Sequence, residues 1–121
     1  MDGTAKSASW FLQANKSNGN TASIYQDIPI ITSPGESYTF SVWLRRNGSG
    51  SRSARVVLWG LGGANESALT WASNIPGAWT QYVVTLNVVQ AGHTTLRAEI
   101  YLDTGCCGLN HDIDASRVVK N

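Results

Sequence analysis

Short segments in which apolar and polar residues alternate recur along the chain, and they predict β-strands. These segments are rich in β-branched and aromatic residues and are separated by clusters of Gly, Ser, Asn and Pro, the composition expected of strands and of the turns between them. No segment has the apolar spacing of an amphipathic helix without a helix breaker. The predicted strands are Ser9–Ala14, Ala22–Ile30, Ser37–Arg46, Ser53–Trp59, Ala68–Ala72, Gln81–Val88, Thr94–Asp103 and His111–Val119.

Three of these strands divide cleanly into an apolar and a polar face, because side chains alternate from one side of a strand to the other. The predicted inward-facing residues are Tyr38, Phe40, Val42 and Leu44, then Tyr82, Val84, Leu86 and Val88, and then Leu96, Ala98, Ile100 and Leu102. Strands with one buried face and one solvent-exposed face are typical of antiparallel sheets that stack face to face. We therefore predict an all-β sandwich, a jelly roll of about eight antiparallel strands.

Length and charge limit the number of domains and the kinds of partner that the sequence allows. The 121 residues suit a single domain, residues 1–121. The net charge is +1, 14% of residues are charged, and no basic run is present, which argues against nucleic acid and anionic membranes as partners. The apolar stretches are shorter than the roughly 20 residues of a membrane-spanning helix. The start of the sequence, Met1–Thr4, does not lead into the basic and then apolar segments that mark a secretion signal.

Two outward-facing strand surfaces carry large aromatic side chains beside hydrogen-bonding groups. These are Trp43 and Arg45 on one strand, and Arg97, Glu99, Tyr101 and Asp103 on another. A sugar ring packs its C–H groups on an aromatic face and presents hydroxyls that need both donors and acceptors. The two surfaces therefore make carbohydrate the favoured ligand.

Each of these residues also has a structural interpretation. Trp43 is expected either to face a sugar or to be covered by a loop, and Arg97 and Glu99 either to bind ligand or to pair with charges on neighbouring strands. Trp79, which follows a Pro-Gly turn, is interpreted as a plug in the core. Trp71 is a candidate exposed loop aromatic.

Enzyme signatures are missing. The chain has no GxSxG, HExxH or P-loop motif. A glycosidase needs two carboxylates about 5–9 Å apart, whereas Glu99 and Asp103 are spaced roughly 13 Å apart along one strand. We predict that the protein is not an enzyme, and rank a small hydrolase last among its functions.

The sequence offers one candidate metal site and one cysteine pair. Asp112 and Asp114, which follow His111, share a strand face about 7 Å apart and would supply oxygens to a structural Ca²⁺; solvated or turn-capping carboxylates are the alternative. Cys106 and Cys107 are adjacent, and they are either two reduced thiols or a strained disulfide.

Several strings, in order, resemble carbohydrate-binding modules of the galactose-binding-like group that includes families 4, 9 and 22. They are Ile24–Ile28, Pro34–Arg45, Trp79-x-x-Tyr82, Leu96–Leu102 and Asp112–Ala115. The resemblance implies a jelly roll that is secreted as part of a larger polysaccharide-degrading enzyme and binds a glycan chain on one sheet. It places Trp43, Gln26, Glu99 and Tyr101 at the sugar, and Asp114 at a calcium. The family motif has a second Asp where this chain has Ala115, and its opening strand is reduced to Asp2-Gly3-Thr4.

The resulting functional prediction is a non-catalytic module that binds a polysaccharide, with Trp43 and Tyr101 as stacking surfaces. Gln26, Arg45, Arg97 and Glu99 are expected to orient the sugar. The alternative is a structural or adhesive β-sandwich of a secreted or cell-surface protein, with the same aromatics buried against a neighbouring domain.

Overall fold

A computed structural model describes residues 12–16, 22–47, 53–102 and 109–121 of the chain. These residues form strands β1 (Leu12–Lys16), β2 (Ala22–Pro29), β3 (Ser37–Asn47), β4 (Ala54–Leu61), β5 (Glu66–Ala72), β6 (Thr80–Asn87), β7 (Thr95–Leu102) and β8 (Leu109–Lys120). The described part holds no helix long and apolar enough to span a bilayer. Ser9–Phe11 and Asp103, at the ends of two predicted strands, lie outside the described residues.

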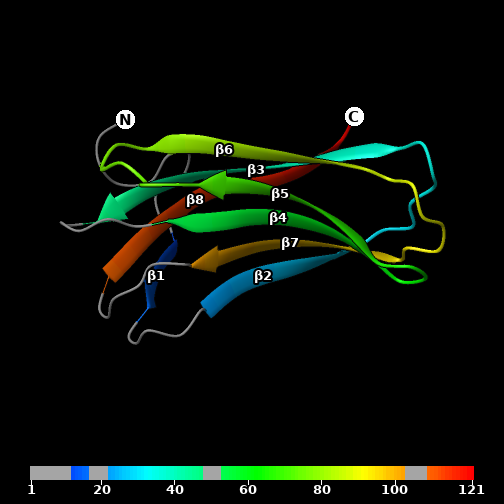
Figure 1. The fold of residues 1–121 in the computed structure, drawn as a ribbon, viewed down its shortest axis with the longest axis horizontal. Helices are drawn as coiled ribbons and strands as arrows, with labels where there is room; N and C mark the ends of the chain where they lie inside the picture. The colour runs from blue at the N-terminus through cyan, green and yellow to red at the C-terminus, as the bar shows by residue number, and fades with distance from the viewer. Residues whose placement is uncertain (1–11, 17–21, 48–52, 103–108) are drawn as a thin grey trace.

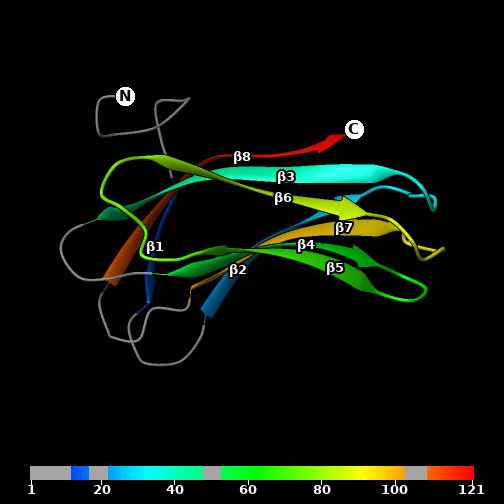
Figure 2. The ribbon, with the colours of Figure 1, turned by 45° about the horizontal axis from the view of Figure 1, so that its top comes forward.

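The strands form two stacked four-stranded sheets (Figures 1 and 2). Sheet A has the order β1-β8-β3-β6 and sheet B the order β2-β7-β4-β5, and every neighbouring pair is antiparallel. The first strand pairs with the last, and the second with the last but one, which is the nested pairing of a jelly roll. The prediction of an antiparallel jelly-roll sandwich is confirmed.

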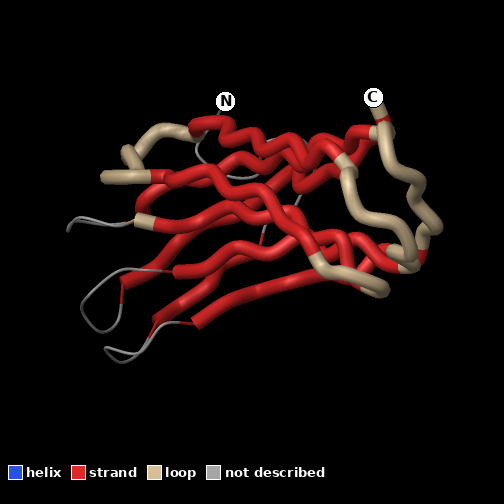
Figure 3. The backbone as a smooth tube through the Cα atoms, turned by 45° about the vertical axis from the view of Figure 1, so that its right-hand side comes forward, coloured by secondary structure: helices blue, strands red, loops and turns tan. Residues whose placement is uncertain are grey.

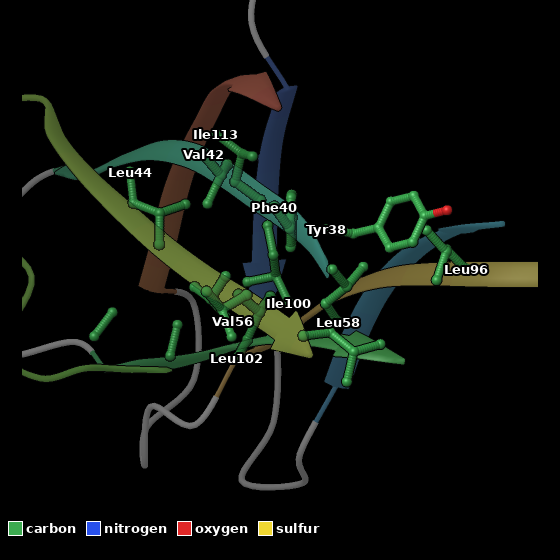
Figure 4. Packing of buried hydrophobic residues seen from close by; sticks show 14 of the residues in the cluster. Tyr38, Phe40, Val42, Leu44, Val56, Leu58, Leu96, Ile100, Leu102 and Ile113 are labelled. Carbon is green, nitrogen blue, oxygen red and sulfur yellow. The ribbon is translucent and has the colours of Figure 1, made fainter. Parts of the chain in front are cut away.

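The core lies between the sheets and uses the predicted inward faces. Tyr38, Phe40, Val42 and Leu44 of β3 are at most 2% exposed, and they meet side chains of sheet B across the interface (Figure 4). The predicted inward residues of β6 and β7 also belong to the core or pack against it. Because side chains alternate along each strand, burying one face of each sheet turns the other two faces to opposite sides of the molecule.

The loops gather at the two ends of the sandwich (Figure 3), and at one end a buried histidine ties two of them together. His93, in the loop between β6 and β7, is 0% exposed. Its Nδ1 lies 2.8 Å from the carbonyl oxygen of Gly62, and its Nε2 lies 2.7 Å from Oε2 of Glu66. Both neighbours are hydrogen-bond acceptors, so the ring satisfies both only as the doubly protonated imidazolium.

A glycine near the end of β4 and glycines in the turn that follows it leave room for this contact. A Cβ on Gly60 would lie 2.6 Å from the His93 ring. Gly63 has a φ of +63°, and a Cβ there would lie 2.4 Å from the carbonyl oxygen of Ala91. Glu66 also accepts hydrogen bonds from the backbone N–H groups of Val89 and Gln90. The β4–β5 hairpin is therefore fastened to the loop that leads into β7.

Stability is expected to depend on pH through this pair. Burial acts to lower the pKa of His93, but the hydrogen bonds to Glu66 and Gly62 and the charge of Glu66 outweigh it, and the pKa is raised. Burial acts to raise the pKa of Glu66, but the hydrogen bonds from His93, Gln90 and Val89 lower it. The contribution of His93 to the free energy of unfolding is fully present below about pH 6.5, the pKa of histidine in the unfolded chain. The contribution of the Glu66 carboxylate is fully present above about pH 4.5, the pKa of glutamate in the unfolded chain.

We therefore expect thermal stability to be highest between about pH 4.5 and 6.5 and to fall as the pH rises through the folded-state pKa of His93. Glu66→Gln should reduce stability by about 1.5–3 kcal/mol near pH 6 and flatten the alkaline fall. Thermal unfolding followed by circular dichroism from pH 4 to 9 measures both. An unchanged alkaline fall in Glu66→Gln would contradict this role for the pair.

Candidate functional site

The outer face of sheet B carries an aromatic and charged surface, which we call the sheet B platform. It consists of the outward side chains of β2, β7, β4 and β5, aligned across the strands by their register. Its three rows are Ser23, Tyr101, Arg55 and Trp71; then Tyr25, Glu99, Val57 and Leu69; then Asp27, Arg97, Trp59 and Ser67.

Large apolar side chains of the platform face solvent. Trp71 is 58% exposed, Tyr25 55% and Leu69 47%, whereas Val57 and Glu99 in the middle row are buried. Single exposed apolar residues are ordinary, but several of them on one face mark a binding surface. The platform is therefore a candidate binding surface.

Two arginines lie against the aromatic rings of the platform. The guanidinium carbon of Arg55 lies 4.6 Å from the ring centroid of Tyr101 and 5.5 Å from that of Trp71. Arg97 lies 4.1 Å from the ring centroid of Tyr25. At these distances a guanidinium is attracted to the face of an aromatic ring, so each arginine favours the observed arrangement of the rings beside it.

Arg97 is also paired with Asp27, through Nε at 2.7 Å and Nη2 at 3.0 Å. The hydrogen bond from Arg97 lowers the pKa of Asp27. This forked pair is exposed and contributes little stability, but it fixes the plane of the guanidinium. The predicted alternative for Arg97, a charge pair across neighbouring strands, is confirmed.

Glu99 lies under the platform rather than on its surface. It is 7% exposed, and its Oε1 accepts a hydrogen bond from Nε1 of Trp59 at 3.0 Å while its Oε2 accepts one from the hydroxyl of Ser23 at 2.7 Å. Burial, a hydrogen bond with Glu99 and the charge of Glu99 raise the pKa of Tyr101. Glu99 lies on the outward face of β7 as predicted, but neighbouring side chains cover it.

The structure does not bring all the predicted sugar-binding residues together. Arg97, Glu99 and Tyr101 belong to the sheet B platform, whereas Trp43 and Arg45 lie on the outer face of sheet A. The two groups therefore lie on opposite sides of the sandwich, because each strand buries its alternate residues between the sheets. The predicted use of Trp43 and Tyr101 on one sheet face is wrong.

The side chain of Gln26 points inward, away from the outer faces of both sheets. It pairs with Ala98 in the register of β2 and β7 and shares the inward side with Ile24 and Ile28. There it lines a cavity of about 310 Å³ between the sheets, together with apolar residues such as Phe40. Gln26 is thus separated from the platform by the backbone of sheet B.

The candidate calcium ligands lie on sheet A, where Asp112 pairs with Arg45 and Asp114 with Trp43 in the register of β3 and β8. Asp112 is fully buried, and its Oδ2 lies 2.6 Å from Nε of Arg45. A guanidinium thus holds one of the oxygens that a metal would need. Within the described ranges no group of three His, Cys, Asp or Glu side chains comes together. The calcium site stays a prediction.

Comparisons with solved structures show which known proteins have a similar fold. A family 16 carbohydrate-binding module is 16% identical, with 96% of this chain and 80% of that chain covered and a TM-score of 0.66. A family 61 module solved with β-1,4-galactotriose is 11% identical, with 98% and 76% covered and a TM-score of 0.67. The chain has the β-sandwich fold of carbohydrate-binding modules.

A third solved structure shows such a fold beside a catalytic module. It is a fragment of xylanase 10B from Clostridium thermocellum that joins a family 22 carbohydrate-binding module to a GH10 module and was solved with xylohexaose. Its sequence is 14% identical to this chain, the match covers 100% of this chain and 24% of that chain, and the TM-score is 0.70. No protein-family model and no curated protein matches the chain. The three solved structures confirm the predicted resemblance to this group of modules for the fold.

The platform includes aromatic and charged residues that were not among the predicted sugar-binding residues, notably Tyr25, Arg55, Trp59 and Trp71. The inward alternation of Ile24 and Ile28 already predicts that Tyr25 faces outward. Alternation does not show which way Trp59 faces, because both faces of β4 are apolar: Val57 is buried on the outer face and Leu58 on the inner one.

Two tryptophans had structural interpretations that the structure tests. Trp71 lies within strand β5, inside the predicted strand Ala68–Ala72, and its side chain is exposed. Trp79 is not part of the core cluster; its ring centroid lies 4.6 Å from the guanidinium of Arg45, on the sheet A side. Cys106 and Cys107 lie outside the described residues.

The pairing of Arg45 with Asp112 leads to a stability prediction. Arg45→Met should cost roughly 3 kcal/mol, because the buried carboxylate of Asp112 loses its guanidinium partner. Urea unfolding measures the change. Arg117→Met, at an exposed arginine of the same sheet, is the matched control and should change stability by less than about 0.5 kcal/mol. Equal effects of the two substitutions would show that the pair contributes nothing specific.

Proposed function

We propose that the protein is a non-catalytic module that binds a polysaccharide chain on the sheet B platform. The observation that carries this proposal is the set of exposed and half-buried aromatic rings, held by Arg55 and Arg97, on one sheet face. Rings of this kind stack on the C–H face of a sugar, while the neighbouring guanidinium and hydroxyl groups bind its hydroxyls. Trp71, Tyr25, Tyr101 and Trp59 are the proposed stacking residues.

The platform carboxylates support a binding role rather than a catalytic one. Asp27 is bonded to Arg97, and Glu99 accepts hydrogen bonds from Trp59 and Ser23. A glycosidase needs one carboxyl group to give a proton to the glycosidic oxygen and another to activate water or attack the sugar. Both carboxylates are already engaged in holding the platform, so we propose that the module performs no hydrolysis.

The setting proposed for this module is a larger secreted protein in which it directs an attached glycoside hydrolase to a β-linked plant or microbial polysaccharide. A xylanase with a module of this fold beside its catalytic module supports that setting. Each sugar contact is weak once the cost of ordering is included. Tethering to an enzyme that holds the same substrate would raise the effective affinity.

Affinity electrophoresis in gels with soluble glucan, xylan, mannan or galactan tests the proposal. We expect at least one polysaccharide to retard the wild type, and Trp71→Ala to lose most of that retardation, because removing a central aromatic contact weakens binding by about tenfold or more. Trp71 is exposed, so its removal should leave the fold intact.

Trp43→Ala is the matched control, since it removes the same side chain from the outer face of sheet A. We expect its retardation to equal that of the wild type. Retardation by none of the polysaccharides with folded protein would overturn the proposal. It would favour the alternative of a structural or adhesive domain, in which the exposed aromatics contact a neighbouring domain.

A further inference from the structure

The buried carboxylate of Glu99 connects three strands of sheet B beneath the platform. Glu99 comes from β7, Ser23 from β2 and Trp59 from β4, and the two donors contact different oxygens of the one carboxylate. The Glu99 carboxylate accepts hydrogen bonds from Trp59 and Ser23, one on each oxygen, and at 7% exposed it offers little surface to a ligand. Its geometry suits the holding of neighbours better than contact with sugar.

The indole ring of Trp59 is the neighbour most affected. Trp59 is half-buried on the outer face of β4, and its N–H donates to Glu99 at 3.0 Å. An indole can turn about two side-chain torsions, and the hydrogen bond at its nitrogen end fixes which way its flat face points. A stacking surface works only when that face is presented to the sugar.

The charge of Glu99 also acts on the rest of the platform. The hydrogen bond to Asp27 raises the pKa of Arg97, and the charge of Glu99 adds to that effect. Burial raises the pKa of Tyr101, and Glu99 adds to it by hydrogen bond and by charge. Glu99 is thus in electrostatic contact with the platform on both sides of its own position in β7.

We infer that Glu99 is a positioning residue, which acts on the ligand through the orientation of Trp59 and makes no contact with the sugar. The inference rests on the proposed function for the identity of the ligand. It revises the role expected for Glu99 from a sugar contact to a support beneath the stacking surface. Trp59 then becomes a residue that determines specificity, because the angle of its ring decides which sugar face it meets.

Two substitutions at Glu99 separate these roles. Glu99→Gln keeps one oxygen for the Trp59 N–H and an amide that donates to the Ser23 hydroxyl, so we expect the affinity to stay within about twofold of the wild type. Glu99→Leu keeps the size and removes both acceptors, so we expect a loss of about tenfold or more. The affinity is measured by isothermal titration with each panel polysaccharide that retards the wild type.

A double-mutant cycle with Trp59→Ala tests whether the effect passes through the indole. We expect Trp59→Ala to weaken binding about as much as Glu99→Leu, and the double variant to be no weaker than Trp59→Ala alone. Losses that multiply in the double variant would overturn the inference, because Glu99 would then act on the ligand independently of Trp59. Unchanged binding in Glu99→Leu would overturn it as well.

Glu36→Leu is the control for general destabilisation. Glu36 also holds neighbours with its carboxylate, accepting from the Tyr38 hydroxyl at 3.1 Å and from the backbone N–H of Ser33 at 2.7 Å, but it precedes β3 of the other sheet. We expect this variant to lose stability and to keep the wild-type affinity. An affinity loss equal to that of Glu99→Leu would show a structural effect only.

A measurement without ligand keeps this inference separate from the proposed function. The indole N–H signal of Trp59 in a ¹H–¹⁵N NMR spectrum is expected to be protected from solvent exchange in the wild type and in Glu99→Gln. It should lose that protection in Glu99→Leu. Should Glu99→Leu not fold, fast exchange of this signal in the wild type would contradict the inference. Failure of every polysaccharide to bind would overturn the proposed function and leave this result standing.

Discussion

The burial of one face of each sheet is the constraint on which the rest of the structure depends. Phe40, Val42 and Leu44 of β3 fill the space between the sheets with residues such as Val56 and Ile100 of sheet B. Because a strand offers only two sides, each buried residue sends its neighbours outward. The core therefore decides that Arg97 and Tyr101 share one outer face while Trp43 and Arg45 occupy the opposite one.

That division gives the two outer faces different roles. On sheet A, Arg45 and Asp112 form a buried ion pair, which satisfies their charges within the protein. On sheet B, the aromatic rings remain exposed beside guanidinium groups. The β4–β5 hairpin, which carries Trp59 and Trp71, is fastened at its turn by His93 and Glu66. The two strands that carry these tryptophans are therefore held at one end by contacts with the loop that leads into β7.

The strands and their inward faces could be predicted from the sequence where one side is apolar and the other polar. In β3, β6 and β7 that contrast is strong, and the structure confirms it. In β5 it is reversed: the small Ala72 is buried, while the larger Leu69 and Trp71 point to solvent. A pattern that assigns large apolar residues to the core fails there, because Leu69 and Trp71 lie on the outer face of sheet B.

Which residues share a sheet could not be predicted from alternation alone. The separation of Trp43 from Tyr101 follows from pairing β3 with β8 and β7 with β2, and these pairings join segments far apart in the sequence. The burial of Glu99 is likewise a product of its neighbours across three strands, Ser23 and Trp59. The resemblance to carbohydrate-binding modules predicted the fold correctly, and it grouped Trp43 with Tyr101, which lie on different sheets of this chain.

The central claim is that a polysaccharide binds on the sheet B platform, and one ligand titration tests it most directly. The chain has five tryptophans, and their indole N–H signals can be followed together by NMR as a soluble glucan, xylan, mannan or galactan is added. We predict that the signals of Trp59 and Trp71 shift and that those of Trp43 and Trp79 stay in place. Shifts at Trp43 and Trp79, with Trp59 and Trp71 unchanged, would contradict the account.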